Sequence, residues 1–179
     1  MSAKAFGFTA NVFKIIPSVY TLNNGNSTVS KIPLFTGYPI DPWATIGSLS
    51  SAYPQAIVKD SSGNVYTANS GNGTISKITA AGVVTDPWAT LAIGASPYGI
   101  AIDSSGNVYT TNSDSTVSKI TAAGVVTDSW AKLRINTNST AIAIDSSGNV
   151  YTANFLNSTV SKITPSGTCL LYTSDAADE

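Results

Sequence analysis

A ten-residue segment occurs three times along the chain, and this repetition constrains the fold more than any other feature of the sequence. The segment Asp60–Asn69 (DSSGNVYTAN) returns as Asp103–Asn112, with Thr111 in place of the Ala, and unchanged as Asp145–Asn154, at offsets of 43 and 42 residues. A degraded fourth copy precedes them, because Val19–Asn23 matches the second half of the segment. The chain is therefore expected to build one small structural unit about four times over.

Each unit is predicted to consist of four short strands. In the third copy these are residues 98–102, 108–111, 116–121 and 125–130, which are rich in Val, Ile, Thr and Tyr and bounded by turn residues. The long 3.6-residue apolar patterns of helical solenoids are missing. A period of about 40 to 45 residues is then typical of propeller blades. We predict an all-β protein, a β-propeller of four-stranded antiparallel blades with about three and a half to four blades, which form a truncated, open ring.

Other residues that recur once per unit are interpreted as structural. The Asp of each Asp-Ser-Ser-Gly-Asn turn is expected to accept backbone N–H groups two or three residues further on, while the Gly adopts a left-handed conformation. The Trp is expected to fill space between blades. The Lys is expected to lay its aliphatic stem over a neighbouring blade. These recurring residues are Trp43, Trp88 and Trp130, and Lys31, Lys77, Lys119 and Lys162.

A second set of acids, Asp41, Asp86 and Asp128, stands two residues before each Trp. A catalytic acid is needed once, whereas a structural residue is needed in every blade, so these acids are also interpreted as structural. The Asn-x-Ser/Thr sequences at Asn26, Asn72, Asn138 and Asn157 are interpreted as turn chemistry.

Composition excludes several classes of function. The 179 residues include no His, one Cys and one Met, so the commonest general base and any thiol-rich metal site are lacking. The positive and negative charges are nearly balanced, with nine Lys and Arg residues and ten Asp and Glu residues, and Arg134 is the only arginine. No nucleic-acid partner is therefore expected. The sequence has no apolar run of about 18 residues, so no membrane span is expected.

The motif DSSGNVYTAN followed by STVSKIT resembles the NHL repeat and the related streptogramin-lyase-like and gluconolactonase-like propellers, over roughly residues 11 to 167. This resemblance specifies a blade but only weakly a function. Lyases of that type rely on histidine with a metal ion, and gluconolactonase-like propellers bind a divalent metal through Glu, Asn and Asp. The repeats hold neither His nor Glu. No catalytic residue, metal ligand or cofactor is therefore predicted.

The predicted propeller fragment covers residues 1–168, in repeat units of about 11–53, 54–96, 97–138 and 139–168. Residues 169–179 depart from the repeat, and they contain the lone Cys and three of the ten acids. This segment resembles the conceptual translation of a transposase adapter used in sequencing libraries, so it is set aside as a non-native tail. A genuine C-terminal strand and tail is the alternative.

One end of a propeller collects the inter-blade loops and the connections between the second and third strands of each blade. These segments vary between the copies, and variable loops on a rigid scaffold are common recognition sites. The predicted ligand-binding residues are Tyr53, Gln55, Asn69, Tyr98, Asn112, Asp114, Asn154 and Phe155. For Asp114, the only acid of the repeats outside their pattern, a solvated loop role is the simpler alternative.

We predict a non-enzymatic binding or interaction scaffold of bacterial origin, with a protein, peptide or carbohydrate ligand. One alternative is a fragment of a streptogramin-lyase-like or gluconolactonase-like enzyme whose catalytic residues lie outside the chain. Another alternative is a structural repeat of a bacterial surface protein. An open ring also exposes strand edges and blade faces through which the chain could self-associate. Localisation is left open. The N-terminal residues do not form a recognisable signal peptide, so either the protein is cytosolic or its true start is missing, in which case the full-length bacterial protein could be secreted or displayed at the cell surface.

Overall fold

The computed structural model describes residues 18–33, 40–46, 52–134 and 137–172. Within these ranges the chain forms antiparallel β-sheets and a single turn of 3-10 helix, η1 (Asn24–Asn26). The sheets follow one another along the sequence without exchanging strands, and each is called a blade here, numbered in chain order. No helix among the described residues is long and apolar enough to cross a membrane.

Blade 1 consists of β1 (Ser18–Asn23), β2 (Thr28–Pro33) and β3 (Ile40–Thr45). Blade 2 consists of β4 (Pro54–Lys59), β5 (Val65–Asn69), β6 (Thr74–Ile78) and β7 (Val84–Thr90). Blade 3 consists of β8 (Pro97–Ile102), β9 (Val108–Asn112), β10 (Thr116–Ile120) and β11 (Val126–Lys132). Blade 4 consists of β12 (Ser139–Ile144), β13 (Val150–Asn154), β14 (Thr159–Ile163) and β15 (Cys169–Tyr172).

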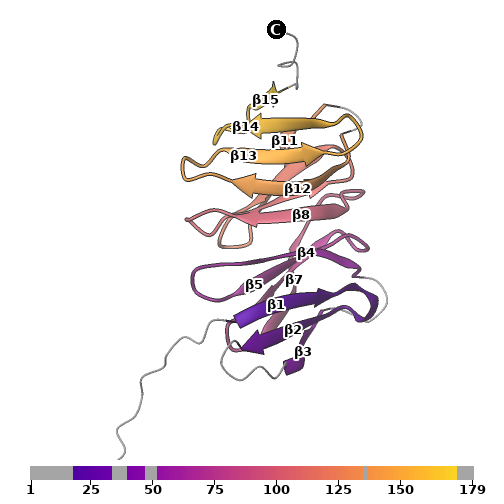
Figure 1. Ribbon diagram of the computed structural model, residues 1–179, viewed down its shortest axis with the longest axis vertical. Coiled ribbons are helices and arrows are strands. Elements are labelled where there is room, and N and C mark those ends of the chain that lie inside the picture. Colours follow the sequence, from indigo (N-terminus) through magenta and orange to yellow (C-terminus); the bar gives the residue numbers. More distant parts are fainter. Residues whose placement is uncertain (1–17, 34–39, 47–51, 135–136, 173–179) are drawn as a thin grey trace, which may run out of the picture.

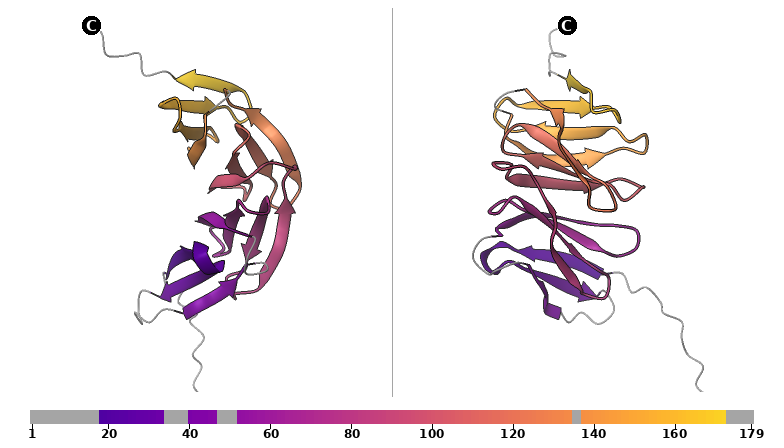
Figure 2. Two further views of the ribbon diagram at one scale, coloured as in Figure 1. Left: turned by 90° about the vertical axis from the view of Figure 1, so that its right-hand side faces the viewer. Right: turned by 180° about the vertical axis from the view of Figure 1, so that it is seen from behind.

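The blades stack face against face along a curved arc (Figure 1). The first strands β4, β8 and β12 contact one another along the inside of the curve, and the fourth strands β7 and β11 lie on the outside (Figure 2). Blade 1 and blade 4 occupy opposite ends of the arc and do not meet. The predicted fold class, an open β-propeller of antiparallel blades, is thus confirmed.

The strands predicted in the third copy agree with β8 to β11 to within two residues at each end. Blade 1 has three strands among the described residues, and the first part of its predicted unit, residues 11–17, lies outside them. In blade 4, β15 pairs with β14 in antiparallel register, Ile163 opposite Cys169. Residues 169–172, set aside as part of a tail, therefore complete the fourth sheet.

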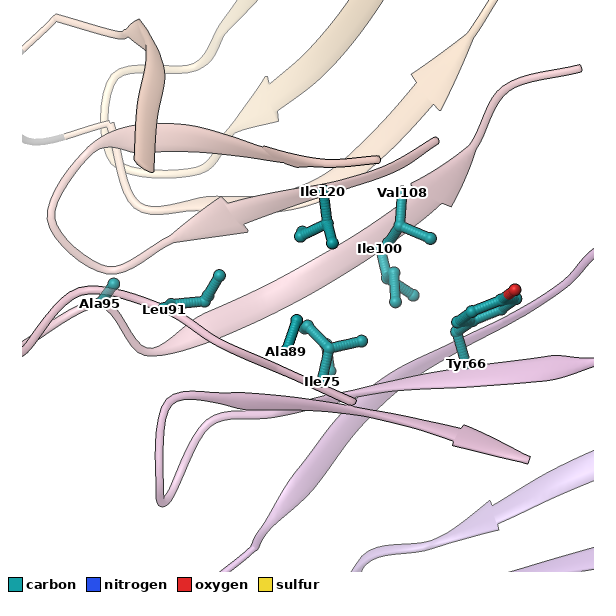
Figure 3. Packing of buried hydrophobic residues seen from close by; sticks show 9 residues of the cluster. Tyr66, Ile75, Ala89, Leu91, Ala95, Ile100, Val108 and Ile120 are labelled. Atoms are coloured by element: carbon teal, nitrogen blue, oxygen red, sulfur yellow. The ribbon is translucent and has the colours of Figure 1, made fainter. Parts of the chain in front are cut away.

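The hydrophobic core lies between the blades. The core between blades 2 and 3 joins Ile75, on the face that blade 2 turns toward blade 3, to Val108 and Ile120, on the facing side of blade 3 (Figure 3). Equivalent cores lie between blades 1 and 2 and between blades 3 and 4. Burial of such a side chain stabilises the fold by about 1.5 to 3 kcal/mol, so each blade depends on its neighbours to shield its apolar faces from water.

The recurring tryptophans contact the next blade, as predicted. The ring of Trp88 packs edge-on against Tyr66 of its own blade, with centroids 5.1 Å apart. Its indole nitrogen also lies against Gly124 in blade 3, where an added Cβ would be 3.3 Å from it. Gly124 has a φ of 86°, so both the turn and the close contact favour glycine.

The recurring lysines lie over aromatic rings of their own blade. The ammonium of Lys77 lies 5.5 Å from the ring centroid of Tyr66 and 5.7 Å from that of Trp88, and both rings belong to its own blade. Lys31 and Lys119 repeat this arrangement. The Tyr and Lys are opposite each other on adjacent strands, so the ammonium makes cation–π contact within the blade. Contact of the aliphatic stem with a neighbouring blade stays a prediction.

Candidate ligand-binding face

Backbone hydrogen bonds define the end of the arc that was predicted to bind ligand. The Ser70 amide donates to the Tyr53 carbonyl at 3.1 Å, and the Phe155 amide donates to the Asn138 carbonyl at 3.3 Å. In blade 3, the Ser113 amide donates to the Ser96 carbonyl at 3.0 Å. In blades 2, 3 and 4, the connection between the second and third strands is thereby tied to the inter-blade loop before its own blade. These segments together are called the loop end.

The opposite end, called the turn end, carries the repeated tight turns. In blade 3, Asp103 Oδ1 accepts hydrogen bonds from the backbone amides of Ser105 and Asn107, both at 2.9 Å. Its Oδ2 accepts from the Asn107 amide group at 2.8 Å and from the Tyr109 hydroxyl at 3.1 Å. The carboxylate thus reaches two and four residues along the chain, one residue beyond the predicted reach, and its role is structural.

These hydrogen bonds control the ionisation of the turn. Burial acts to raise the pKa of Asp103, but hydrogen bonds from Asn107, Tyr109 and Ser105 outweigh it and hold the pKa below its usual value. Burial, followed by the charge of Asp103 and its hydrogen bond, raises the pKa of Tyr109 to about 12. Asp60 and Tyr66 repeat both effects in blade 2. Both partners therefore keep their ordinary protonation states at neutral pH.

A cavity of about 530 Å³ opens at the turn end between blades 2 and 3. Its lining includes Lys59, Lys77 and the two turn acids Asp60 and Asp103. The carboxylates of both acids are already engaged by donors of their own turns. Among the described residues, no three His, Cys, Asp or Glu side chains are grouped so that they could hold a metal ion.

Three of the predicted ligand-binding residues are buried inside the blades. Asn69 is fully buried, and its amide group donates to Thr74 Oγ1 at 3.1 Å and to Ser76 Oγ at 2.7 Å. Its carbonyl oxygen accepts from Thr67 Oγ1 at 3.0 Å. Asn112 and Asn154 make the same contacts in their blades. A ligand at the loop end would not reach these buried side chains, so they do not belong to the candidate site.

The same network accounts for the second set of repeated acids. Ser76, which accepts from Asn69, donates its hydroxyl to Asp86 Oδ1 at 2.6 Å. Ser30 donates to Asp41 at 2.6 Å and Ser118 donates to Asp128 at 3.3 Å in the same way. The acid of the fourth strand is thereby joined to the second and third strands of its blade. This supports the structural interpretation of these residues.

Asp114 is exposed at the loop end, where it shapes a turn. Its Oδ1 accepts from the Thr116 amide at 3.2 Å and from the Thr116 hydroxyl at 2.6 Å. Asn72 and Asn157 accept from the equivalent Thr hydroxyls, each at 2.7 Å. Asp114 therefore takes the place of a turn Asn. It also lines a cavity of about 470 Å³, together with Ser113 and Lys132.

The remaining predicted residues lie at the surface of the loop end. Tyr53 is 54% exposed and Phe155 is 71% exposed. Gln55 is exposed and donates to Ser70 Oγ at 3.2 Å, whereas Tyr98 is half-buried. Tyr53 and Phe155 belong to blades 2 and 4, so blade 3 lies between them and the structure does not join all four into one cluster.

Leu156 is a surface residue that the sequence interpretation did not single out. It follows Phe155 and is 61% exposed, and these two adjacent exposed apolar residues are called the Phe155–Leu156 pair. The repeat itself distinguishes this pair, because Asn24–Gly25 and Ser70–Gly71 occupy the same positions in blades 1 and 2. Only a position-by-position comparison of the copies reveals this change from polar to apolar residues.

Comparison with known proteins agrees with the repeat architecture. The family model described as a β-propeller repeat (SBBP) matches residues 88–113, which run from the end of blade 2 through β9. Virginiamycin B lyase from Staphylococcus aureus superposes with a TM-score of 0.78 at 19% sequence identity, over 90% of this chain and 54% of the lyase. The chain spans about half the length of this structure and of a streptogramin B lyase structure.

Two further solved structures share the fold at similarly low sequence identity. A putative gluconolactonase superposes with a TM-score of 0.67 at 13% identity, over 86% of this chain and 59% of that protein. A chain of a nidogen/laminin complex gives a TM-score of 0.64 at 16% identity, over 88% of this chain and 62% of that chain. No curated protein sequence matches significantly. At these identities the likeness shows the propeller fold alone, and the chain is built from β-propeller repeats.

Proposed function

We propose that this chain of β-propeller repeats is a non-enzymatic binding scaffold whose loop end binds a protein or peptide through an apolar contact. The observation that carries the proposal is the Phe155–Leu156 pair, which lies exposed on the connection between β13 and β14. Burying such side chains in a partner would gain about 1.5 to 3 kcal/mol each.

The fold itself does not require this apolar pair. Blades 1 and 2 make the same connection, of the same length, with Asn24–Gly25 and Ser70–Gly71. The stacking of a further blade would not bury the position of Leu156 either, and the position of Phe155 would be no more than half-buried, as Ser70 is in blade 2. Gly71 is exposed even though blade 3 covers the sheet to which it belongs. The pair is thus a surface feature of one blade, placed where the scaffold accepts polar residues.

The backbone that carries the pair is held in place. The Phe155 amide donates to the Asn138 carbonyl at 3.3 Å, and the Leu156 amide donates to the Thr137 carbonyl at 3.2 Å. Asn157 then accepts from the Thr159 hydroxyl at 2.7 Å, which closes the turn. Because the connection is already ordered, binding would cost little backbone entropy.

The chemistry of the loop end favours a protein or peptide partner. Exposed aromatic and aliphatic side chains are common anchors of protein interfaces, and Tyr53 adds a second aromatic side chain at this end. The formal net charge of -1 supplies little long-range attraction, so binding should depend weakly on salt. One solved structure of similar fold comes from a complex of two proteins, nidogen and laminin.

A displayed peptide library tests the proposal. Peptides would be selected on the wild-type chain and then measured on a variant that carries Phe155→Ser and Leu156→Gly, the residues of blade 2. We expect affinity to fall at least about tenfold, since loss of one well-packed apolar anchor costs about 1.4 kcal/mol or more. The matched control carries Val83→Ser and Val125→Ser, two exposed apolar residues at the turn end, and should bind as the wild type does.

Two results would contradict the proposed function. One is that the selection enriches no peptide. The other is that the loop-end variant and the turn-end control lose affinity equally, which would place the contact elsewhere. Circular dichroism of each variant checks that its sheets are intact.

A further inference from the structure

The last sheet of the arc exposes a position that the other sheets bury. Val160 on β14 is 46% exposed. The same position of the repeat is Val29 in blade 1, Ile75 in blade 2 and Val117 in blade 3, and all three side chains are fully buried. They are buried because the next blade covers that face, as blade 4 covers Val117. On blade 4 this face is left open, and Ala153 beside Val160 is exposed as well.

The first sheet exposes the opposite half of the same interface. Val19 on β1 is 48% exposed, whereas its repeat equivalents Val65, Val108 and Val150 are fully buried. Thr21 is exposed too, although Thr67 and Thr110 at the same position are fully buried. This face is the one that each later blade turns toward the blade before it.

Inside the arc these two kinds of face pack against each other three times. Val29 of blade 1 shares a core with Val65 of blade 2. Val117 of blade 3 shares a core with Val150 of blade 4. Between blades 2 and 3, Ile75 takes part in the same way with Val108 (Figure 3). At these positions of the second and third strands, the open faces on blades 4 and 1 therefore carry the two halves of an interface that the chain already makes.

We infer that two copies of this chain associate head to tail, with blade 4 of each copy stacked on blade 1 of the other. Two arcs of four blades would then close a ring of eight, which lies within the range of about four to eight blades at which propellers close. The chain spans 54% of the S. aureus lyase, so one arc corresponds to roughly half of such a protein. The curvature of the arc brings both open faces to the same side (Figure 2).

A second copy fits these faces better than an unrelated partner does. It supplies the same residue types, in the same register, that cover Val117 and Val65 within the arc. With a formal net charge of -1, two copies repel each other little. A head-to-tail contact forms a closed ring when its rotation returns to the start and an open filament when it does not. The size of the assembly therefore tests the geometry directly.

Sedimentation equilibrium of the full chain is the first test. We expect a species of about twice the 18.4 kDa chain mass that dissociates on dilution. A chain that stays monomeric at all concentrations up to about 100 µM would overturn the inference. Polymers without a size limit would overturn ring closure.

Charged substitutions then locate the contact. Val160→Glu and Val19→Lys should each convert the dimer to a monomer, because each places a charge in both interfaces of the ring. The matched control Val83→Lys changes a side chain that is 62% exposed and lies on neither face, and it should remain dimeric. Loss of the dimer in all three variants, or in none, would overturn the proposed interface.

A mixing experiment then tests which faces meet. A 1:1 mixture of the Val160→Glu and Val19→Lys chains should recover a heterodimer. The two introduced charges are opposite in sign and would face each other across one of its interfaces, while the other interface keeps both valines. A mixture that stays monomeric would count against the head-to-tail pairing of these two faces.

A covalent test remains informative if a charged variant fails to fold. In a Cys169→Ser background, the double variant Val19→Cys and Val160→Cys should form dimers with a short bismaleimide cross-linker. The pair Val83→Cys and Val160→Cys should not. Cross-linked dimers of Val160→Cys alone would indicate tail-to-tail contact and overturn the head-to-tail arrangement, as would a double variant that stays monomeric.

Discussion

The hydroxyl of Tyr109 donates a hydrogen bond to the carboxylate of Asp103 at 3.1 Å, and so joins a surface turn to the core between two blades. The Tyr109 ring packs edge-on against Trp130, with centroids 5.1 Å apart, and belongs to the core that blade 3 shares with blade 4. Blades 2 and 4 repeat the bond through Tyr66 and Tyr151. The repeat thus couples its turn chemistry to blade stacking at one residue.

Removal of this hydroxyl should weaken the fold. Tyr109→Phe keeps the ring in the core but deprives the Asp103 carboxylate of one donor. We expect the free energy of unfolding to fall by about 1.5 kcal/mol, the lower range for a hydrogen bond to a charged group. Chemical denaturation measures the change. Tyr53→Phe, at an exposed tyrosine, is the control and should shift stability by less than about 0.5 kcal/mol; equal effects would contradict the assigned role.

The turn carboxylates predict a loss of stability in acid. Burial opposes the shift at Asp60 and Asp103, but hydrogen bonds hold the pKa of both, and of Asp145, below the usual value. The unfolded chain therefore binds protons at a higher pH than the folded one. The stabilisation is complete above the unfolded pKa, about 3.9, and is lost as pH falls through the folded pKa. Denaturant titrations should give a constant stability from about pH 6 to 5 and a declining one below about pH 4; an unchanged value at pH 3 would argue against these bonds.

The pKa values of two tyrosines predict a loss of folding stability at alkaline pH. Burial, with a smaller contribution from the neighbouring carboxylate, raises the pKa of Tyr66 and of Tyr109 to about 12. The folded state thus favours the neutral phenol, and its stabilisation is present below the unfolded pKa of about 10 and lost as pH rises toward 12. Ultraviolet titration of phenolate formation should show tyrosines that ionise near pH 12, above the ordinary value of about 10. If every tyrosine ionised near pH 10 in the folded protein, this burial would be refuted.

Asp114 offers a test between a ligand-binding and a turn-forming role. Asp114→Asn keeps the oxygen that accepts from Thr116 and restores the residue type found at Asn72 and Asn157. Stability should change by less than about 0.5 kcal/mol. Asp114→Ala removes the acceptor and should cost about 1 kcal/mol. Thermal unfolding compares the two variants, and a larger loss for Asn than for Ala would be inconsistent with the turn role.

The blade architecture could be predicted because its signals are local. Asp103 and Gly106 specify a tight turn within five residues, and the Val-Tyr-Thr runs that follow are strong strand formers. The strand Cys169–Tyr172 was only the alternative to a non-native tail, because it lacks the repeat motif. Backbone hydrogen bonds to β14 do not depend on side-chain identity, so an unrelated extended segment can complete the sheet.

The binding residues were harder to predict because burial depends on partners in other strands. An Asn beside a turn, such as Asn69, resembles a surface residue in sequence. It is buried because Ser76 and Thr74 on the adjacent strand satisfy its amide group. The exposure of Leu156 could have been inferred from the turn glycines, Gly25 and Gly71, at the same position in blades 1 and 2. The open faces on blades 1 and 4 became visible only when the burial of repeat positions was compared in three dimensions.

The central claim, that successive blades are stabilised by packing against each other, is tested most directly by a double-mutant cycle across one interface. Ile75 of blade 2 and Ile120 of blade 3 are both fully buried in the same core. Ile163, equally buried, belongs to a different core and provides the control pair with Ile75. Unfolding free energies of the alanine variants should give a coupling energy of about 0.5 to 3 kcal/mol for Ile75 with Ile120, and additivity within about 0.5 kcal/mol for Ile75 with Ile163. Additivity for both pairs would contradict the stacked-blade account.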